Sequence, residues 1–306
     1  MRVKREFSPV QGLLPRPGNH VFCCNRAGFP KDSAIMQSTR IILSLSLFFA
    51  ASALAQKKAP AQSEDIDHIR QELGVNEFTA PSIDLVFTEL AELKPIPFDK
   101  VWRDLPDESP QDRAGLAVAA GAVIADGFLA VSAEKQSRIE PVGRVLLRLA
   151  KGLGVGEHVT KHSRSILEKA ARKEWSDVKL ELTRAQADVE AALLALKDEE
   201  IAHLVALGGW VRGLEITAGI VLEGYTPARA RRLIQPELMD YFLERVATLN
   251  PNLKKSKLGQ TLAKNLAEAK AITAKPVETP ITKDEVKTIR DLAREIREVA
   301  GGGGEG

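Results

Sequence analysis

The sequence predicts an all-α protein, a single irregular bundle of about nine or ten helices without a sheet. The chain of 306 residues is rich in Ala, Leu, Glu, Lys and Arg, which are strong helix formers. Apolar residues recur at helical spacing, and no segment alternates apolar and polar residues as a half-buried strand does. Proline and capping residues also occur where helices are expected to begin.

Composition and charge exclude several classes of protein. The chain has 43 Lys and Arg against 41 Asp and Glu, and therefore lacks the positive charge of a strongly basic nucleic-acid binder. With 44% apolar residues and 5% aromatic residues, it is neither a disordered chain nor a polytopic membrane protein. We find no repeat of fixed period, which argues against a solenoid.

Residues 36–55 have the three parts of a secretory signal peptide. Residues 36–40 form a short start with one positive charge, residues 41–52 form an apolar run, and Ala53-Leu54-Ala55 has the small-x-small pattern of a cleavage site. The apolar run is shorter than the roughly 20 residues of a membrane span. The alternative is an uncleaved N-terminal anchor. We expect cleavage, and hence a periplasmic or secreted protein.

Residues 1–35 do not resemble the start of a signal peptide, because they contain scattered prolines and show no periodicity. We interpret them as untranslated, with Met36 as the true start, or as disordered. Cleavage after Ala55 would remove both cysteines and change the formal charge from +2 to about −3. The expected mature chain is free of cysteine, has no disulfide and has no integral membrane segment.

The remaining chain divides into a spacer with a short helix (56–81), a helical core (82–275), and a linker with an amphipathic helix and a Gly-rich tail (276–306). Within the core we expect helices to begin at or near Ser82, Ser109-Pro110, Pro141, Glu157, Ser176, Asp198, Thr226-Pro227, Pro236 and Asn250-Pro251.

The last predicted helix begins with a capping box, Thr282 to Glu285, and runs to about residue 300. It carries an apolar stripe at helical spacing. The stripe docks either on the protein's own core or on another protein. Its members are Val286, Ile289, Ala293 and Ile296.

Asp126 interrupts residues 114–130, which are otherwise small or apolar. A membrane span would place this carboxylate in lipid, where it is costly, so we favour a helix buried on all faces. The residues three and four positions away on either side are apolar and offer no partner. If buried, Asp126 needs hydrogen bonds or a cation from another element.

Residues 207–216 carry glycines inside a predicted helix, each costing up to about 1 kcal/mol relative to alanine. Gly209 and Gly213 share one face of that helix. Such glycines are tolerated where another backbone comes close, and we expect the small-residue helix at 114–130 to be that neighbour.

We predict that Arg212 reaches Asp126, with Arg113 or Glu215 nearby. One interpretation is a buried ion network that sets the register of the helices. The other is a polar ligand pocket in which Trp210 forms a wall and Arg212 receives an anion.

His158 and His162 lie one helical turn apart, a spacing that can hold a metal ion. The intervening residues lack the glutamate of a His-Glu-x-x-His motif, so the first interpretation is a solvated helix face. We predict neither a metal nor a cofactor.

Two functions follow from these observations. The first is an exported, non-enzymatic helical protein that binds a protein partner or a small ligand, and not nucleic acid. It is favoured because no P-loop, nucleophile elbow or dinucleotide motif is found. The alternative is a helical periplasmic hydrolase or lyase that uses Asp126 and Glu215 at one cavity, with or without His158 or His162.

Overall fold

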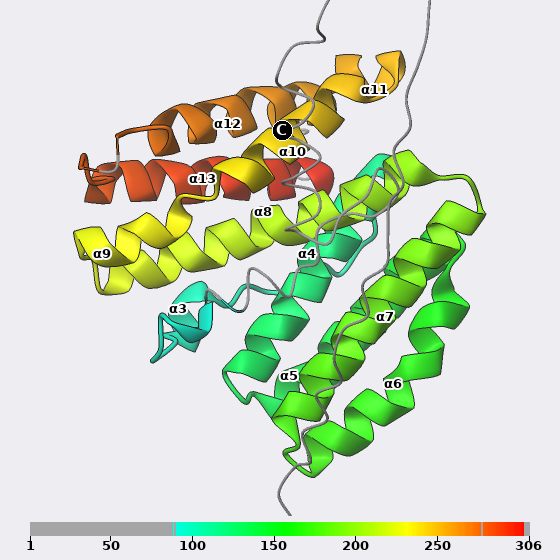
Figure 1. Ribbon diagram of the computed structural model, residues 1–306. Helices are drawn as coiled ribbons and strands as arrows, with labels where there is room; N and C mark the ends of the chain where they lie inside the picture. The colour runs from blue at the N-terminus through cyan, green and yellow to red at the C-terminus, as the bar shows by residue number, and fades with distance from the viewer. Residues whose placement is uncertain (1–87, 89, 277, 303–306) are drawn as a thin grey trace, which may run out of the picture. The chain divides into compact units, whose positions relative to one another are not determined.

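The computed structural model describes residues 88, 90–276 and 278–302, which belong to one compact unit (Figure 1). Every regular element in these residues is a helix, which confirms the all-α prediction. The predicted signal peptide, both cysteines and the spacer at 56–81 lie outside the described residues. The elements are α3 (Phe98–Val101), α4 (Arg113–Ser132), α5 (Gln136–Leu153), α6 (Gly156–Ala171), α7 (Trp175–Ala195), α8 (Glu199–Glu223), α9 (Pro227–Ala230), the 3₁₀ helix η1 (Arg231–Leu233), α10 (Pro236–Thr248), α11 (Pro251–Lys255), α12 (Lys257–Thr273) and α13 (Lys283–Ala300).

Helices α4 and α8 pack against each other and form the centre of the bundle. Helices α5, α6 and α7 lie to one side of them, and α10, α12 and α13 lie to the other (Figure 1).

By length and composition both central helices, α4 and α8, could cross a membrane. However, 100% of the most apolar window of α4 and 94% of that of α8 are buried inside the bundle. Such burial is what the core helix of a water-soluble fold also shows.

The closest approach of α4 and α8 is made by Gly121 and Gly208. A Cβ atom on Gly121 would lie 1.9 Å from the carbonyl oxygen of Val205, and one on Gly208 would lie 2.1 Å from that of Val118. No side chain fits at either position, because these distances are far below van der Waals contact. We expected Gly209 and Gly213 at this crossing. Gly209 does lie at this crossing, since a Cβ atom added to Gly121 would lie 2.6 Å from the backbone nitrogen of Gly209.

The terminal helix α13 packs on α8, α12 and α4. Its predicted apolar stripe is buried there, with Val286 and Ile289 fully inaccessible. The capping box at its start is present, with Thr282 and Glu285 each accepting from the other's backbone. The stripe therefore docks on the protein's own core.

Two helices begin elsewhere than predicted. Asp112, and not Ser109, caps α4 by accepting from the backbone of Gly115. Helix α5 begins at Gln136 and continues through Pro141. Proline removes one backbone donor from a helix, and the residue four positions earlier, Ser137, is exposed, so water can satisfy its carbonyl.

Candidate functional site

Arg212 of α8 meets Asp126 of α4 in the centre of the bundle. Both are buried, with 2% and 0% of their surfaces exposed. Arg212 Nε donates to Asp126 Oδ1 at 2.8 Å, and its Nη2 donates to the carbonyl oxygen of Val101 at 2.8 Å. Its Nη1 lies 2.9 Å from Glu215 Oε2. Each of the three guanidinium nitrogens of Arg212 therefore has an acceptor within the protein.

The two acids of this cluster have further arginine partners. Arg103, which follows α3, lies 2.7 Å from the second oxygen of Asp126. Arg294 and Arg297 of α13 donate to Glu215 at 3.2 and 2.9 Å. We call these six side chains the ion network; its members are Arg103, Asp126, Arg212, Glu215, Arg294 and Arg297.

The charges of the ion network outweigh the effect of burial on its central groups. Burial alone lowers the pKa of Arg212, but Asp126 and Glu215 raise it above its ordinary value. Burial alone raises the pKa of Glu215, but Arg212 and Arg297 lower it to about 2. Both groups are thus held charged near neutral pH.

Two predicted members lie elsewhere. Arg113 pairs with Asp198, half-exposed at the surface. It is the first residue of α4, thirteen positions before Asp126, or about 20 Å along the helix. Trp210 points away from Arg212, because two positions correspond to about 200° of helical rotation. Its indole nitrogen donates to Gln235 at 2.9 Å, and its ring packs at a tilt against Phe242. The ion network therefore joins α4, α8 and α13 and offers Arg212 no open contact for an anion.

His162 differs from the expected solvated face, because it is buried between two carboxylates of α7. Its Nδ1 lies 2.7 Å from Glu181 and its Nε2 lies 3.0 Å from Asp188. Lys169 also donates to Glu181, and together with His162 it lowers the pKa of that carboxyl to about 2. His158 is exposed. Among the described residues, no three His, Cys, Asp or Glu side chains are arranged to hold a metal.

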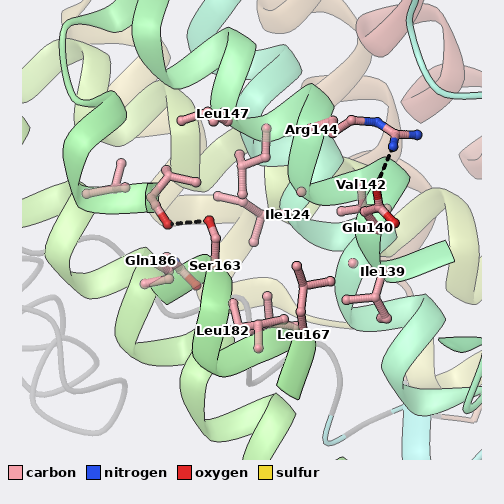
Figure 2. A pocket seen from close by; sticks show the side chains of 17 residues that line it. Ile124, Ile139, Glu140, Val142, Arg144, Leu147, Ser163, Leu167, Leu182 and Gln186 are labelled. Atoms are coloured by element: carbon pink, nitrogen blue, oxygen red, sulfur yellow. Dashed lines mark hydrogen bonds and ion pairs between the residues drawn. The ribbon is translucent and has the colours of Figure 1, made fainter. Parts of the chain in front are cut away.

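A separate apolar pocket lies where α4, α5, α6 and α7 meet (Figure 2). Its cavity volume is about 180 Å³. This is slightly larger than an engineered cavity of about 150 Å³ that stays dry and binds benzene. Most of its wall is aliphatic, including Ile124, Val142, Leu147, Leu167, Leu182 and Val189.

The few polar side chains of the apolar pocket lie on two sides of it (Figure 2). On one side, Ser163 uses its hydroxyl to donate to the backbone of Val159, within its own helix. On the other, Glu140 and Arg144 form an ion pair in which both side chains are mostly exposed. Neither group presents a net charge to the interior of the pocket.

Gln186 is the exception within this wall. It is 3% exposed, and its Nε2 donates to Glu190 Oε1 at 2.8 Å. Its Oε1 is buried and has no hydrogen-bond partner among the described residues. Buried polar atoms are normally paired, so this oxygen needs an explanation.

Our sequence analysis did not identify this pocket. One signal was present, because Gln186 lies four residues after Leu182 and three before Val189, inside the apolar seam of its helix. A polar residue in such a seam marks a buried hydrogen-bonding group, but it does not reveal a cavity. Comparison with protein-family models, curated proteins and solved structures finds no match to this chain.

Proposed function

We propose that this protein is a non-enzymatic binding protein that takes one small apolar molecule into the apolar pocket between α4, α5, α6 and α7. The observation that carries the proposal is a cavity of about 180 Å³ with an almost wholly aliphatic wall. Concave, mainly apolar sites with a few placed polar groups are typical of small-molecule binding. The signal-peptide pattern at residues 36–55 supports export, so we place this activity outside the cytoplasm.

The cavity volume limits the size of the ligand. By comparison with benzene, which fills a cavity of about 150 Å³, it accommodates about seven non-hydrogen atoms. A ligand of that size, gaining roughly 0.6–1 kcal/mol per atom, binds with a Kd between about 10 µM and 1 mM. The proposed ligand is therefore a small ring or short branched chain, bound weakly to moderately.

Two observations favour ligand binding over the other predicted functions. The alternative hydrolase or lyase would use Asp126 and Glu215 at a cavity, with or without a histidine, whereas both acids belong to the ion network. His162 in turn pairs with Glu181 and Asp188. The stripe considered for docking on a protein partner is buried on α8 and α12. Of the predicted functions, small-ligand binding remains, and the apolar pocket is a cavity that could receive such a ligand.

The test uses toluene, which has seven non-hydrogen atoms, titrated into the purified chain and followed by calorimetry. Gly143 lines the pocket, and a Cβ atom there would meet no atom of the described chain within 4 Å. Gly143→Leu should fill the pocket and abolish binding, whereas the matched Gly143→Ala, with nearly the same gain in helix propensity, should retain it.

A second blocking variant, Ala185→Met, covers the case in which Gly143→Leu does not fold, because Ala185 lines the pocket from α7. Absence of toluene binding to the unmodified protein up to its solubility limit would overturn the proposed function. Binding that survives both blocking variants would place the ligand elsewhere and would overturn it equally.

A further inference from the structure

We propose that His162 attaches α6 to α7 in a pH-dependent way, so that one wall of the apolar pocket is held in place below neutral pH and loosens above it. Where it concerns the ligand, this inference rests on the proposed function, because it assigns a means of regulation to the same pocket. It follows from how few buried residues hold α6 and from the two carboxylates that face the ring of His162.

Helix α6 forms an exposed side of the apolar pocket. The lining residues that come from α4 and α7 are all buried. Of the lining residues that come from α6, Val159 is buried, Ser163 and Ile166 are half-buried, and Leu167 is 43% exposed. Movement of α6 away from α7 would therefore open the pocket to water.

Few buried side chains hold α6 in the bundle. Of its sixteen residues, three are buried, Val159, His162 and Ala170, whereas α5 and α7 each bury seven. His162 is the largest of the three. An element with so little buried apolar surface opens at a low cost in free energy. The contacts that His162 makes with α7 are therefore a large part of what keeps α6 in place.

The ring of His162 satisfies both of its contacts with α7 only when it is protonated. Its Nδ1 lies 2.7 Å from Glu181 Oε1, and its Nε2 lies 3.0 Å from Asp188 Oδ2. A carboxylate only accepts hydrogen bonds and a neutral imidazole has one N–H group, so both contacts are hydrogen bonds only in the imidazolium form. Loss of the proton leaves one ring nitrogen with its lone pair against a carboxylate oxygen. The attachment therefore weakens as the pH rises through the range in which histidine ordinarily titrates, between about pH 5 and 8.

The two carboxylates that face His162 stay ionised throughout that range. Lys169 and His162 lower the pKa of Glu181 to about 2. Lys161 and His162 likewise lower the pKa of Asp188 to about 2. Neither acid takes up a proton between pH 5 and 8, so the ring faces two hydrogen-bond acceptors before and after it titrates.

The other charged groups near His162 are accounted for on each helix that packs against α6. The two lysines of α6 donate to these acids at 2.7 Å each, and Arg184 of α7 lies 3.9 Å from Glu181. Lysine and arginine ordinarily stay charged well above pH 8. On α5, Glu140 and Arg144 pair with each other. Glu190 of α7 titrates in the same range as histidine, because burial raises its pKa to about 7, so the test compares proteins that all keep Glu190.

Hydrogen exchange of the backbone amides measures the attachment of α6. The purified chain is labelled without ligand at pH 5.5 and 8.5, and protection is corrected for the chemical exchange rate at each pH. Protection of α6 is expressed relative to that of α13, which packs on other helices. We expect this relative protection to be about tenfold lower at pH 8.5, the equivalent of about 1.4 kcal/mol.

Two variants assign the effect to His162. In His162→Gln the side chain does not titrate, so the relative protection of α6 should be the same at both pH values. The matched control is His158→Gln. His158 is exposed and lies one turn earlier on the same helix, so this variant should keep the tenfold change.

The affinity for toluene, measured by calorimetry at the same two pH values, links the attachment to the pocket. We expect toluene to bind at least about threefold more weakly at pH 8.5 in the unmodified protein and in His158→Gln, because the ligand binds only molecules in which α6 is in place. This dependence on pH should be smaller in His162→Gln. Ionisation of Glu190 cannot cause that difference, since all three proteins contain Glu190.

The outcomes separate the two proposals. Equal relative protection of α6 at both pH values in the unmodified protein would overturn the inference without any variant, and so would a tenfold change that persists in His162→Gln. If toluene binds with the same affinity at both pH values, the proposed function stands and the regulation of the pocket is wrong. If toluene binds at neither pH, the proposed function fails and regulation of the pocket fails with it, while the exchange data decide whether His162 attaches α6.

Discussion

The substitution Asp126→Asn tests the ion network directly. It preserves the shape of the side chain but removes the charge that faces Arg212 and Arg103 at 2.8 and 2.7 Å. Asp126 is 0% exposed and Arg212 is 2% exposed, so water cannot replace the lost carboxylate. Removing one member of a buried ion pair typically costs about 3–5 kcal/mol. We expect the lower end, because the amide oxygen of asparagine can still accept from Arg212 Nε.

The matched control is Asp198→Asn. Asp198 also pairs with an arginine, Arg113, but the side chains of this pair are 29% and 50% exposed. Exposed pairs contribute at most about 1 kcal/mol. The two variants thus remove the same charge from the same kind of partner and differ mainly in burial.

Urea denaturation followed by circular dichroism measures the free energy of unfolding of both variants. We expect Asp126→Asn to lose about 3 kcal/mol with an unchanged m-value, and its Tm to fall by roughly 6–12 °C. Asp198→Asn should stay within about 1 kcal/mol of the unmodified protein. A loss for Asp126→Asn no larger than that of the control would refute the reasoning that burial makes this network costly to break.

Three further predictions concern the packing and the charges. Gly121→Ala should lower the free energy of unfolding by about 3 kcal/mol, the upper end of the usual cost of overpacking, because its Cβ would overlap a carbonyl oxygen of α8. A loss below about 1 kcal/mol in urea denaturation would show that α4 and α8 move apart at little cost. Glu215 has a pKa lowered to about 2, so its contribution to stability is complete above pH 4.5 and lost as pH falls toward 2. The free energy of unfolding, measured from pH 6 to 2, should therefore depend less on pH in Glu215→Gln than in the unmodified protein. The same pH dependence in both proteins would contradict this assignment. Glu190 has a pKa raised to about 7 by burial, so its ionisation opposes folding increasingly from pH 4.5 to 7. Glu190→Gln should accordingly be more stable than the unmodified protein at pH 8, by at most about 3 kcal/mol, and equally stable at pH 4 in the same unfolding assay.

Local features of the chain were sufficient to predict the helices. The capping box at Thr282 and Glu285 was predicted from four consecutive residues and is present. Three other expected starts, at Thr226, Pro236 and Asn250, have a capping side chain or a proline at the first turn. Helix α8 also begins after Asp198 as expected, although the Asp198 side chain makes no cap hydrogen bond and pairs with Arg113 instead. The start of α5 was misjudged, because Pro141 lies inside the helix, four residues after the exposed Ser137.

The contact between Asp126 and Arg212 was also predictable, because a lone acid in an apolar helix requires a partner from another element. The identity of the remaining partners was not. Arg103, Arg294 and Arg297 approach the two acids from segments distant in sequence. Arg113 does not, although it belongs to the same helix as Asp126.

The sequence by itself determined that this chain forms helices and that certain buried groups need partners, because capping, periodicity and the cost of burying charge depend on neighbouring residues. Only the tertiary structure decided where α4 and α8 cross, at Gly121 and Gly208. It also decided that His162 lies between two carboxylates, and that four helices leave a cavity beside Gln186. These features depend on how side chains from separate helices fill the space between them, and no pattern within a single helix specifies that space.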